Sequence, residues 1–161
     1  MKGYFRSFPC VPADDQDFIA SEKIFVGAEV AGIKISFLGK NYQTWFGNKV
    51  EGAFAGSVLT VCGSSQSSTS ESVLQELGGE EMAETTLREA YHLMKSRQKS
   101  EQKGLLTNCL ANRFCVPDVN GVLRMVSLLM FDGTWNFDAF PIESLSPWPA
   151  GCRIFYHRHD G

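Results

Sequence analysis

The sequence predicts an α+β fold in which an antiparallel sheet packs on one main amphipathic helix. Apolar residues recur at helical spacing between residues 80 and 99, and strand-like runs separated by turn residues fill residues 104–155. Two shorter alternating runs near the N-terminus are expected to join this C-terminal β-meander. We expect one domain over residues 22–156, an N-terminal arm over residues 1–21 and a tail over residues 157–161.

The N-terminal arm lacks a regular hydrophobic period. Pro9 and Pro12 interrupt it, and three aspartates charge its second half. Solvated tails are poor in aromatic residues, but this one contains Tyr4, Phe5, Phe8 and Phe18. We therefore expect part of the arm to dock on the body of the protein or on a neighbouring chain.

The first strand signals lie between Lys23 and Phe37. Two apolar alternations meet around Gly32, where a turn is expected. The residues that share a face are Ile24, Val26, Ala28 and Val30 in the first run and Ile33, Ile35 and Phe37 in the second. Glycines interrupt residues 50–62, which fit either a strand or a short helix, so the conformation of residues 39–62 stays open.

A loop rich in serine and threonine, residues 63–70, separates the two halves of the chain. Ser68 and Glu71 have capping-box spacing, which predicts a short helix that ends at Gly78 or Gly79. A second helix is expected over residues 80–99. The apolar stripe that should face the sheet comprises Ala83, Leu87, Ala90, Tyr91 and Met94.

The clearest strands follow residue 104. Residues 105–116 and 122–131 flank the turn pair Asn120 and Gly121, which predicts a β-hairpin. Both faces of the second strand are apolar, so it is expected in the centre of the sheet. Residues 135–139 alternate apolar and polar side chains and should bury one face. Residues 152–156 are expected to add a short edge strand.

A set of turn and core residues resembles the pattern of a group of small, uncharacterised bacterial proteins. The matching positions are Leu106, Thr107, Asn108, Ala111, Asn112, Asp118, Asn120, Gly121, Leu123 and Arg124, with residues 76–79 upstream and Trp148, Ala150, Gly151 and Phe155 downstream. The likeness covers roughly residues 37–155. It implies a bacterial origin and supports the predicted fold, and it carries over no function.

Composition and charge argue against several classes of function. Hydrophobic residues make up 43% of the chain and charged residues 20%, which is typical of a folded soluble domain. The formal net charge of −3 lacks the basic footprint that nucleic-acid binding requires, so nucleic acid is not expected as a partner. Basic residues between 95 and 103 lie where the second helix should end, and there they complement its dipole.

The chain shows no secretory signal pattern and no apolar run long enough to span a membrane, so we expect a cytoplasmic location and no membrane partner. Its five cysteines are an odd number, which fits reduced thiols better than a disulfide framework. No pair of cysteines has the spacing common in zinc sites, and no phosphate loop is present. We therefore expect neither a metal nor a cofactor.

An enzymatic function is the less favoured interpretation. A cysteine-dependent hydrolase or transferase needs a thiolate beside a histidine. The sequence offers Cys62 or Cys109 as the nucleophile and His92 as the base. Both cysteines lie in apolar runs that are typical of structural positions, and the serine-rich loop lacks the second glycine of a nucleophile turn.

Polar residues within apolar strands are the best candidates for a binding surface. Asn108 and Asn112 share strand parity, and with Arg124 and Trp135 they could line a shallow surface. The alternative is that they satisfy backbone groups at a sheet edge. We therefore predict a non-catalytic binding or assembly module that acts through its sheet surface and aromatic arm, with a protein or a second copy of the chain as partner.

Overall fold

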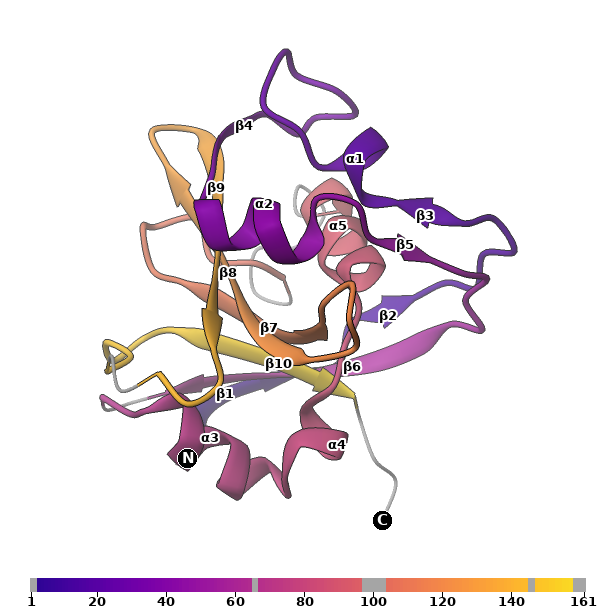
Figure 1. Cartoon of the computed structure of the whole chain (residues 1–161). Coiled ribbons are helices and arrows are strands. Elements are labelled where there is room, and N and C mark those ends of the chain that lie inside the picture. Colours follow the sequence, from indigo (N-terminus) through magenta and orange to yellow (C-terminus); the bar gives the residue numbers. More distant parts are fainter. Residues whose placement is uncertain (1–2, 65–66, 97–103, 145–146, 158–161) are drawn as a thin grey trace.

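The computed structural model describes the backbone of residues 3–64, 67–96, 104–144 and 147–157, and the side chains of all these except residues 3–7 and 64. Figure 1 shows strands wrapped by short helices. The strands are β1 (Gly3–Ser7), β2 (Cys10–Val11), β3 (Phe18–Ile19), β4 (Ile35–Leu38), β5 (Val50–Glu51), β6 (Ser57–Ser64), β7 (Asn112–Pro117), β8 (Leu123–Phe131), β9 (Thr134–Pro141) and β10 (Arg153–His157). The helices are α1 (Ala20–Lys23), α2 (Lys40–Phe46), α3 (Ser70–Leu77), α4 (Glu80–Ala83) and α5 (Leu87–Ser96).

The predicted α+β fold class is confirmed, but the main sheet is mixed, which corrects the expectation of an antiparallel sheet. Its strand order is β1, β6, β10, β7, β8, β9, β4, and β2 also pairs with β6. β10 runs parallel to β7, and β4 runs parallel to β9. Hydrophobic alternation records which side chains are buried but not the direction of a strand, so the sequence pattern could not distinguish these pairings.

β10 was expected at an edge and lies instead between β6 and β7. Its Ile154 and Phe155 are fully buried. The segment before it carries the chain back across the sheet, which lets β10 enter between two strands that are distant in sequence. A five-residue strand buried on both faces carries too short a pattern to reveal this position.

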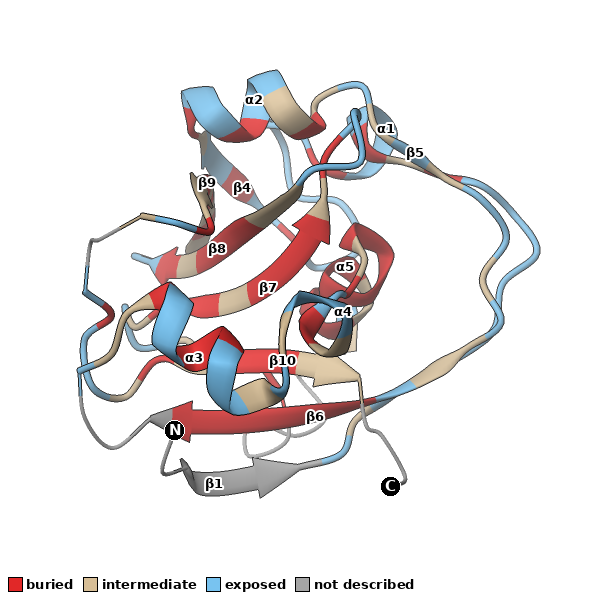
Figure 2. Ribbon diagram, turned by 60° about the horizontal axis from the view of Figure 1, so that its bottom comes forward, coloured by how far each residue is buried: buried red, intermediate tan, exposed pale blue. Residues whose placement is uncertain are grey.

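Hydrophobic clusters cover both faces of the sheet. The inner face, which carries Leu128 and Phe137, packs on α2 and α5. The outer face, which carries Met125 and Ile154, packs on α3, α4 and Trp148. Figure 2 shows α3 and α4 crossing in front of the sheet, with buried strand residues behind them. The protein is therefore built in layers, with the sheet in the middle.

The second predicted helix is divided, so the expectation of one main helix over residues 80–99 is corrected. Glu84 is extended, with φ −61° and ψ 129°, between α4 and α5. The Thr85 amide donates to the Cys115 carbonyl at 2.7 Å and ties the break to β7. The predicted apolar stripe is nevertheless buried along its whole length. Residues 97–99 lie outside the described ranges.

The cap of α3 lies one residue later than predicted. Thr69 is the N-cap, and its hydroxyl accepts from the Ser72 amide at 3.2 Å while Ser72 reciprocates. Ser68 instead exchanges two backbone hydrogen bonds with Trp148, which removes it from the helix. The helix was predicted to end at Gly78 or Gly79, and it ends at Gly78, which has a left-handed φ of 102°.

The predicted hairpin is confirmed as β7 and β8, with Cys115 opposite Met125. β8 lies between β7 and β9, as its apolar faces indicated. On β9, the alternate residues Trp135, Phe137 and Ala139 are buried, also as predicted. Residues 105–111 do not extend β7, and Cys109 there has a left-handed φ of 68°.

The N-terminal half departs most from the expected strands. Of the two runs expected between Lys23 and Phe37, only the second forms a strand, Ile35–Leu38, and Val26 and Val30 of the first are 55% and 50% exposed. Val30 and Ile33 do exchange backbone hydrogen bonds around the predicted turn. Residues 39–62, whose conformation the sequence left open, form α2, β5 and the start of β6.

The segment expected as an arm contributes β1, β2 and β3. Arg88 of α5 fixes its second half, because the guanidinium donates to the Gln16 carbonyl at 2.6 Å and the Gly52 carbonyl at 2.8 Å. Arg88 also pairs with Asp14 at 3.2 Å and lies 5.9 Å from the Phe18 ring centroid. The side chains of Tyr4 and Phe5 lie outside the described part of the chain.

Candidate functional site

The outer face of the sheet is covered at one end and bare at the other. Along β8 the outward side chains are Leu123, Met125, Ser127, Leu129 and Phe131. The first two pack in the cluster beneath α3 and α4. Phe131, at the far end, is 60% exposed. The cover therefore stops about halfway along this strand.

Phe37, Leu129 and Phe131 form what we call the open patch. Asn136 of β9 pairs with Leu129 on one side and with Phe37 on the other, and Thr134 pairs with Phe131. Phe37 is 53% exposed. Because directly paired residues point to the same side of a sheet, the three apolar side chains lie on one face, with polar residues of β9 between Phe37 and the other two.

An irregularity in β4 turns Phe37 to this surface. Between Ile35 and Phe37, two residues of β4 advance against one residue of β9, as in a β-bulge. The Ser36 hydroxyl hydrogen-bonds the Thr134 hydroxyl at 2.8 Å and donates to Asn136 Oδ1 at 3.0 Å. Regular alternation would place Phe37 on the buried side with Ile35, so the bulge is what exposes it.

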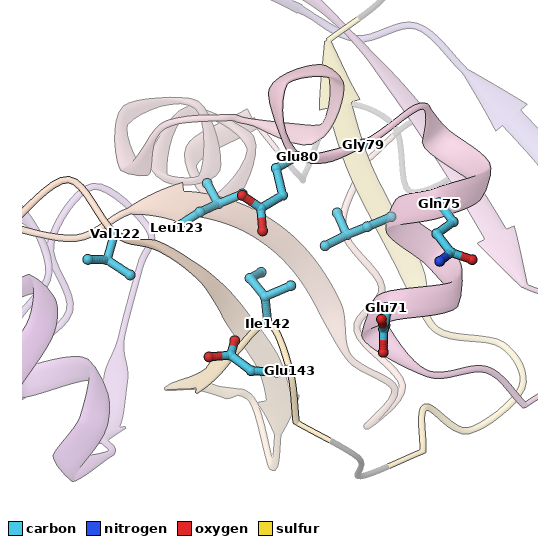
Figure 3. Close-up of a pocket in the computed structure, with 9 residues that line it drawn as sticks. Glu71, Gln75, Gly79, Glu80, Val122, Leu123, Ile142 and Glu143 are labelled. Carbon is cyan, nitrogen blue, oxygen red and sulfur yellow. The ribbon is translucent and has the colours of Figure 1, made fainter.

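At the covered end, a pocket opens between α3, α4 and the ends of β8 and β9. Its volume is about 510 Å³. The residues that line this acidic pocket are Glu71, Leu74, Gln75, Gly79, Glu80, Val122, Leu123, Ile142 and Glu143. Figure 3 shows Glu80 reaching toward Ile142, with Glu143 beside it and Glu71 on the α3 side. Buried Leu74 and Ile142 give the pocket an apolar floor.

Three carboxylates stand at the rim of the acidic pocket. Glu71 comes from α3, Glu80 from α4 and Glu143 from the segment after β9. All three are exposed, and none makes a hydrogen bond or ion pair in the described part of the chain. The lining residues include no lysine or arginine. The pocket thus combines an apolar floor with uncompensated negative charge.

Comparisons with known proteins give no indication of function, so a functional proposal has to rest on this geometry. No family model, curated protein or solved structure matches the chain. Among the described residues, no helix has both the length and the apolar character needed to cross a membrane. In those same ranges, histidine, cysteine and acidic side chains form no group of three that could hold a metal ion.

The predicted site residues Asn108 and Asn112 lie in different environments. Asn112 is fully buried, and its amide donates to the carbonyls of Leu106 at 3.0 Å and Leu128 at 3.2 Å. Its carbonyl oxygen accepts from the Leu106 amide at 2.7 Å. Asn108 is exposed, and its side chain accepts from the Leu110 amide. Asn112 therefore satisfies backbone groups, which is the alternative that the sequence left open.

Arg124 and Trp135, the other two predicted residues, contact their own neighbours. Arg124 Nε donates to Asp118 Oδ2 at 3.0 Å, and its guanidinium lies 3.9 Å from the Trp45 ring centroid. Trp135 is 1% exposed in the inner cluster. The four residues do not share one concave surface, and a binding role for any of them stays a prediction.

The cysteines and His92 are also spread over the fold. Cys62 is buried in the outer cluster, where its thiol donates to the next carbonyl along the chain. Cys109 is exposed in the loop before β7. His92 lines a separate groove between α5 and the N-terminal segment. Cys115, which was not a candidate nucleophile, is also buried. Its burial, with a smaller effect from the charge of Glu80, raises its pKa to about 12. The cysteine-dependent alternative stays a prediction.

A polar cluster that was not predicted from the sequence lies at the start of α5. Glu89 is completely buried, and its Oε1 accepts from the amide and hydroxyl of Thr86 at 3.0 and 2.9 Å. Its Oε2 accepts from the Ser57 hydroxyl at 2.5 Å and lies 2.8 Å from His157 Nε2. Capping-box spacing between Thr86 and Glu89 was the available sequence signal.

This cluster differs from a serine nucleophile site in one decisive respect. Ser57 donates to the carboxylate of Glu89, and His157 contacts the same oxygen. In a serine nucleophile relay the imidazole accepts the hydroxyl proton directly. The arrangement holds β6, α5 and β10 together, so we assign it a structural role.

Proposed function

We propose that this chain is a non-catalytic binding module that docks another polypeptide on the open patch. The observation that carries the proposal is the exposure of two phenylalanines, Phe37 at 53% and Phe131 at 60%, on neighbouring rungs of one sheet face. Proteins usually bury phenylalanine, and exposed apolar patches mark interaction surfaces. Thr134 and Asn136 of β9 lie between Phe37 on β4 and Phe131 on β8, so the open patch combines apolar side chains with polar groups at its centre.

The open patch suits an extended segment of a partner. Fully burying an exposed phenylalanine contributes roughly 1.5–3 kcal/mol. Phe37 and Phe131 are already partly covered, so these two anchors contribute less than that each and do not alone offset the entropy lost on association. β4 is the last strand at its end of the sheet order. Edge strands accept further strands through their backbone groups, which would add hydrogen bonds to the two aromatic anchors.

The N-terminal aromatic residues contribute less to the proposed contact with a partner than the open patch does. Phe18 is buried in the inner cluster, whereas Phe8 is 49% exposed. Phe8 lies between β1 and β2, both of which pair with β6, toward the other end of the sheet from β4. A partner seated on the open patch therefore does not need Phe8, and we assign the principal contact to β4 and β8.

A photocrosslinking residue at position 131 tests this proposal in cells that produce the protein. We expect one discrete adduct, either a second copy of the chain or another protein, and its loss when Phe37 is changed to Ser. The matched control places the crosslinker at Val119, which is 45% exposed in the turn between β7 and β8. Equal adducts from both positions, or no adduct from position 131, would refute the proposal.

Light scattering separates the two kinds of partner. If the partner is a second copy, the mass of the purified protein should rise with concentration, and the Phe37→Ser and Phe131→Ser pair should abolish the rise. Val119→Ser should leave it unchanged. A concentration-independent monomer combined with a discrete adduct in cells assigns the open patch to a different protein.

A further inference from the structure

We propose that the acidic pocket binds lysine or arginine side chains of a partner protein. The inference goes beyond the open patch, which lies at the other end of the outer face, and it shares with the proposed function only the idea of a protein partner. Its basis is the coincidence of an apolar floor, an open volume and uncompensated carboxylates in one place.

The floor of the pocket matches the aliphatic part of a basic side chain. Leu74 and Ile142 lie beneath it with 4% and 7% exposure, while Val122 at its side is 47% exposed. Lysine and arginine lay their methylene stems along apolar surface and keep the charged head near water. A volume of about 510 Å³ accommodates more than one such stem.

The rim matches the charged end. Glu71, Glu80 and Glu143 come from three different segments of the chain. They stand apart from one another around the apolar floor. None of them has a hydrogen-bond or ion-pair partner within the described ranges. The whole chain also carries a net charge of −3. Negative charge at the pocket and on the whole chain raises the rate at which a basic partner is encountered, and it repels acidic partners.

A metal ion fits the same carboxylates less well. A tightly bound ion requires several ligands within bonding distance, and the described residues contain no group of three acidic, histidine or cysteine side chains so arranged. An apolar floor also adds nothing to the binding of a bare cation. Separated carboxylates above an apolar floor instead favour an organic cation with a methylene stem.

Methyl and amide NMR with a short peptide of alternating lysine and leucine tests the inference. We expect shift changes centred on Leu74, Leu123 and Ile142, and no such changes with a peptide of glutamate and leucine. Exposed ion pairs are individually weak. The Glu80→Gln and Glu143→Gln pair should therefore weaken binding about threefold to tenfold, and so should a rise in ionic strength from about 0.05 to 0.3 M.

The Glu22→Gln and Glu29→Gln pair is the matched control, because it removes the same number of charges at two exposed glutamates outside the pocket lining. It should leave the affinity unchanged. Equal weakening by the control, unchanged affinity in the pocket variant, or equal binding of the acidic peptide would overturn the inference. Because these variants leave Phe37 and Phe131 intact, failure of the pocket and failure of the open patch are distinguishable.

Discussion

His157 Nε2 lies 2.8 Å from Oε2 of Glu89, and this contact ties the last strand to the first turn of α5. Glu89 is completely buried, while the His157 side chain is 35% exposed. The same carboxylate caps α5 through Thr86 and accepts from Ser57 of β6. One acidic side chain thereby joins three elements that are distant in sequence.

The contact predicts a pH-dependent stability. The hydrogen bond to Glu89 raises the pKa of His157; partial burial opposes this, and the charges of Glu89 and Glu84 add to the rise. A raised folded-state pKa means that the stabilisation is complete below the unfolded value of about 6.5 and is lost as pH rises through the folded value. Because the ring is partly exposed, we expect a contribution of about 1 kcal/mol or less.

Urea unfolding of the protein and of His157→Gln at pH 5.5 and 8.5 measures this contribution. The difference between the two proteins should be larger at pH 5.5. NMR titration of the His157 ring should give a pKa above that of a histidine in an unstructured peptide. A ring that titrates at or below the peptide value would show that the contact with Glu89 does not favour the charged imidazole.

Removal of the α5 cap should destabilise the fold. Thr86→Ala deletes the hydroxyl that accepts from the Glu89 amide at 3.1 Å, and loss of an N-cap of this kind costs about 1 kcal/mol. The control is Thr44→Ala at an exposed position inside α2, which should change stability little. Both free energies of unfolding come from urea titrations followed by circular dichroism. Equal effects would argue against the cap.

Thiol labelling should separate the five cysteines into two groups. Cys10 and Cys109 are exposed, and Cys62, Cys115 and Cys152 are buried. The raised pKa of Cys115, about 12, further suppresses its reactive thiolate. We expect two thiols to react with iodoacetamide in the native protein and the others only in urea. A single thiol that reacts unusually fast near neutral pH would favour the cysteine-dependent alternative.

Asn112→Ala should affect stability rather than binding. Asn112 is fully buried, and its side chain is the hydrogen-bond partner of the Leu106 amide and carbonyl. The substitution removes that partner from both backbone groups. A buried polar group left unpaired costs about 1–3 kcal/mol. Asn108→Ala, at an exposed position, should cost much less. If Asn112→Ala left the unfolding free energy unchanged but reduced crosslinking from position 131, the predicted binding role of Asn112 would be supported.

Local patterns predicted the elements whose burial follows a single clear period. The β7–β8 hairpin, the central position of β8, the one-sided burial of β9 and the apolar stripe across α4 and α5 all follow from turn residues and periodicity. The same patterns placed Val26 and Val30 in a strand, where the structure leaves them exposed in a loop. Alternation over a few residues does not ensure a pairing partner.

The sites required contacts that no local pattern contains. Phe37 is exposed because β4 bulges against β9, about a hundred positions away in sequence. Glu71, Glu80 and Glu143 form one rim only because α3, α4 and the end of β9 meet over the outer face. Spacing along the chain gives no information about either event.

By itself, the sequence determined the α+β class, the hairpin, the buried stripe and the end of α3 at the Gly78–Gly79 pair, because these depend on turn chemistry and hydrophobic period within short windows. The tertiary structure alone decided the directions of β4 and β10, the break between α4 and α5, and the joining of Ser57, Glu89 and His157. The physical reason is that strand direction and side-chain encounter are set by how distant segments bury their shared apolar surface.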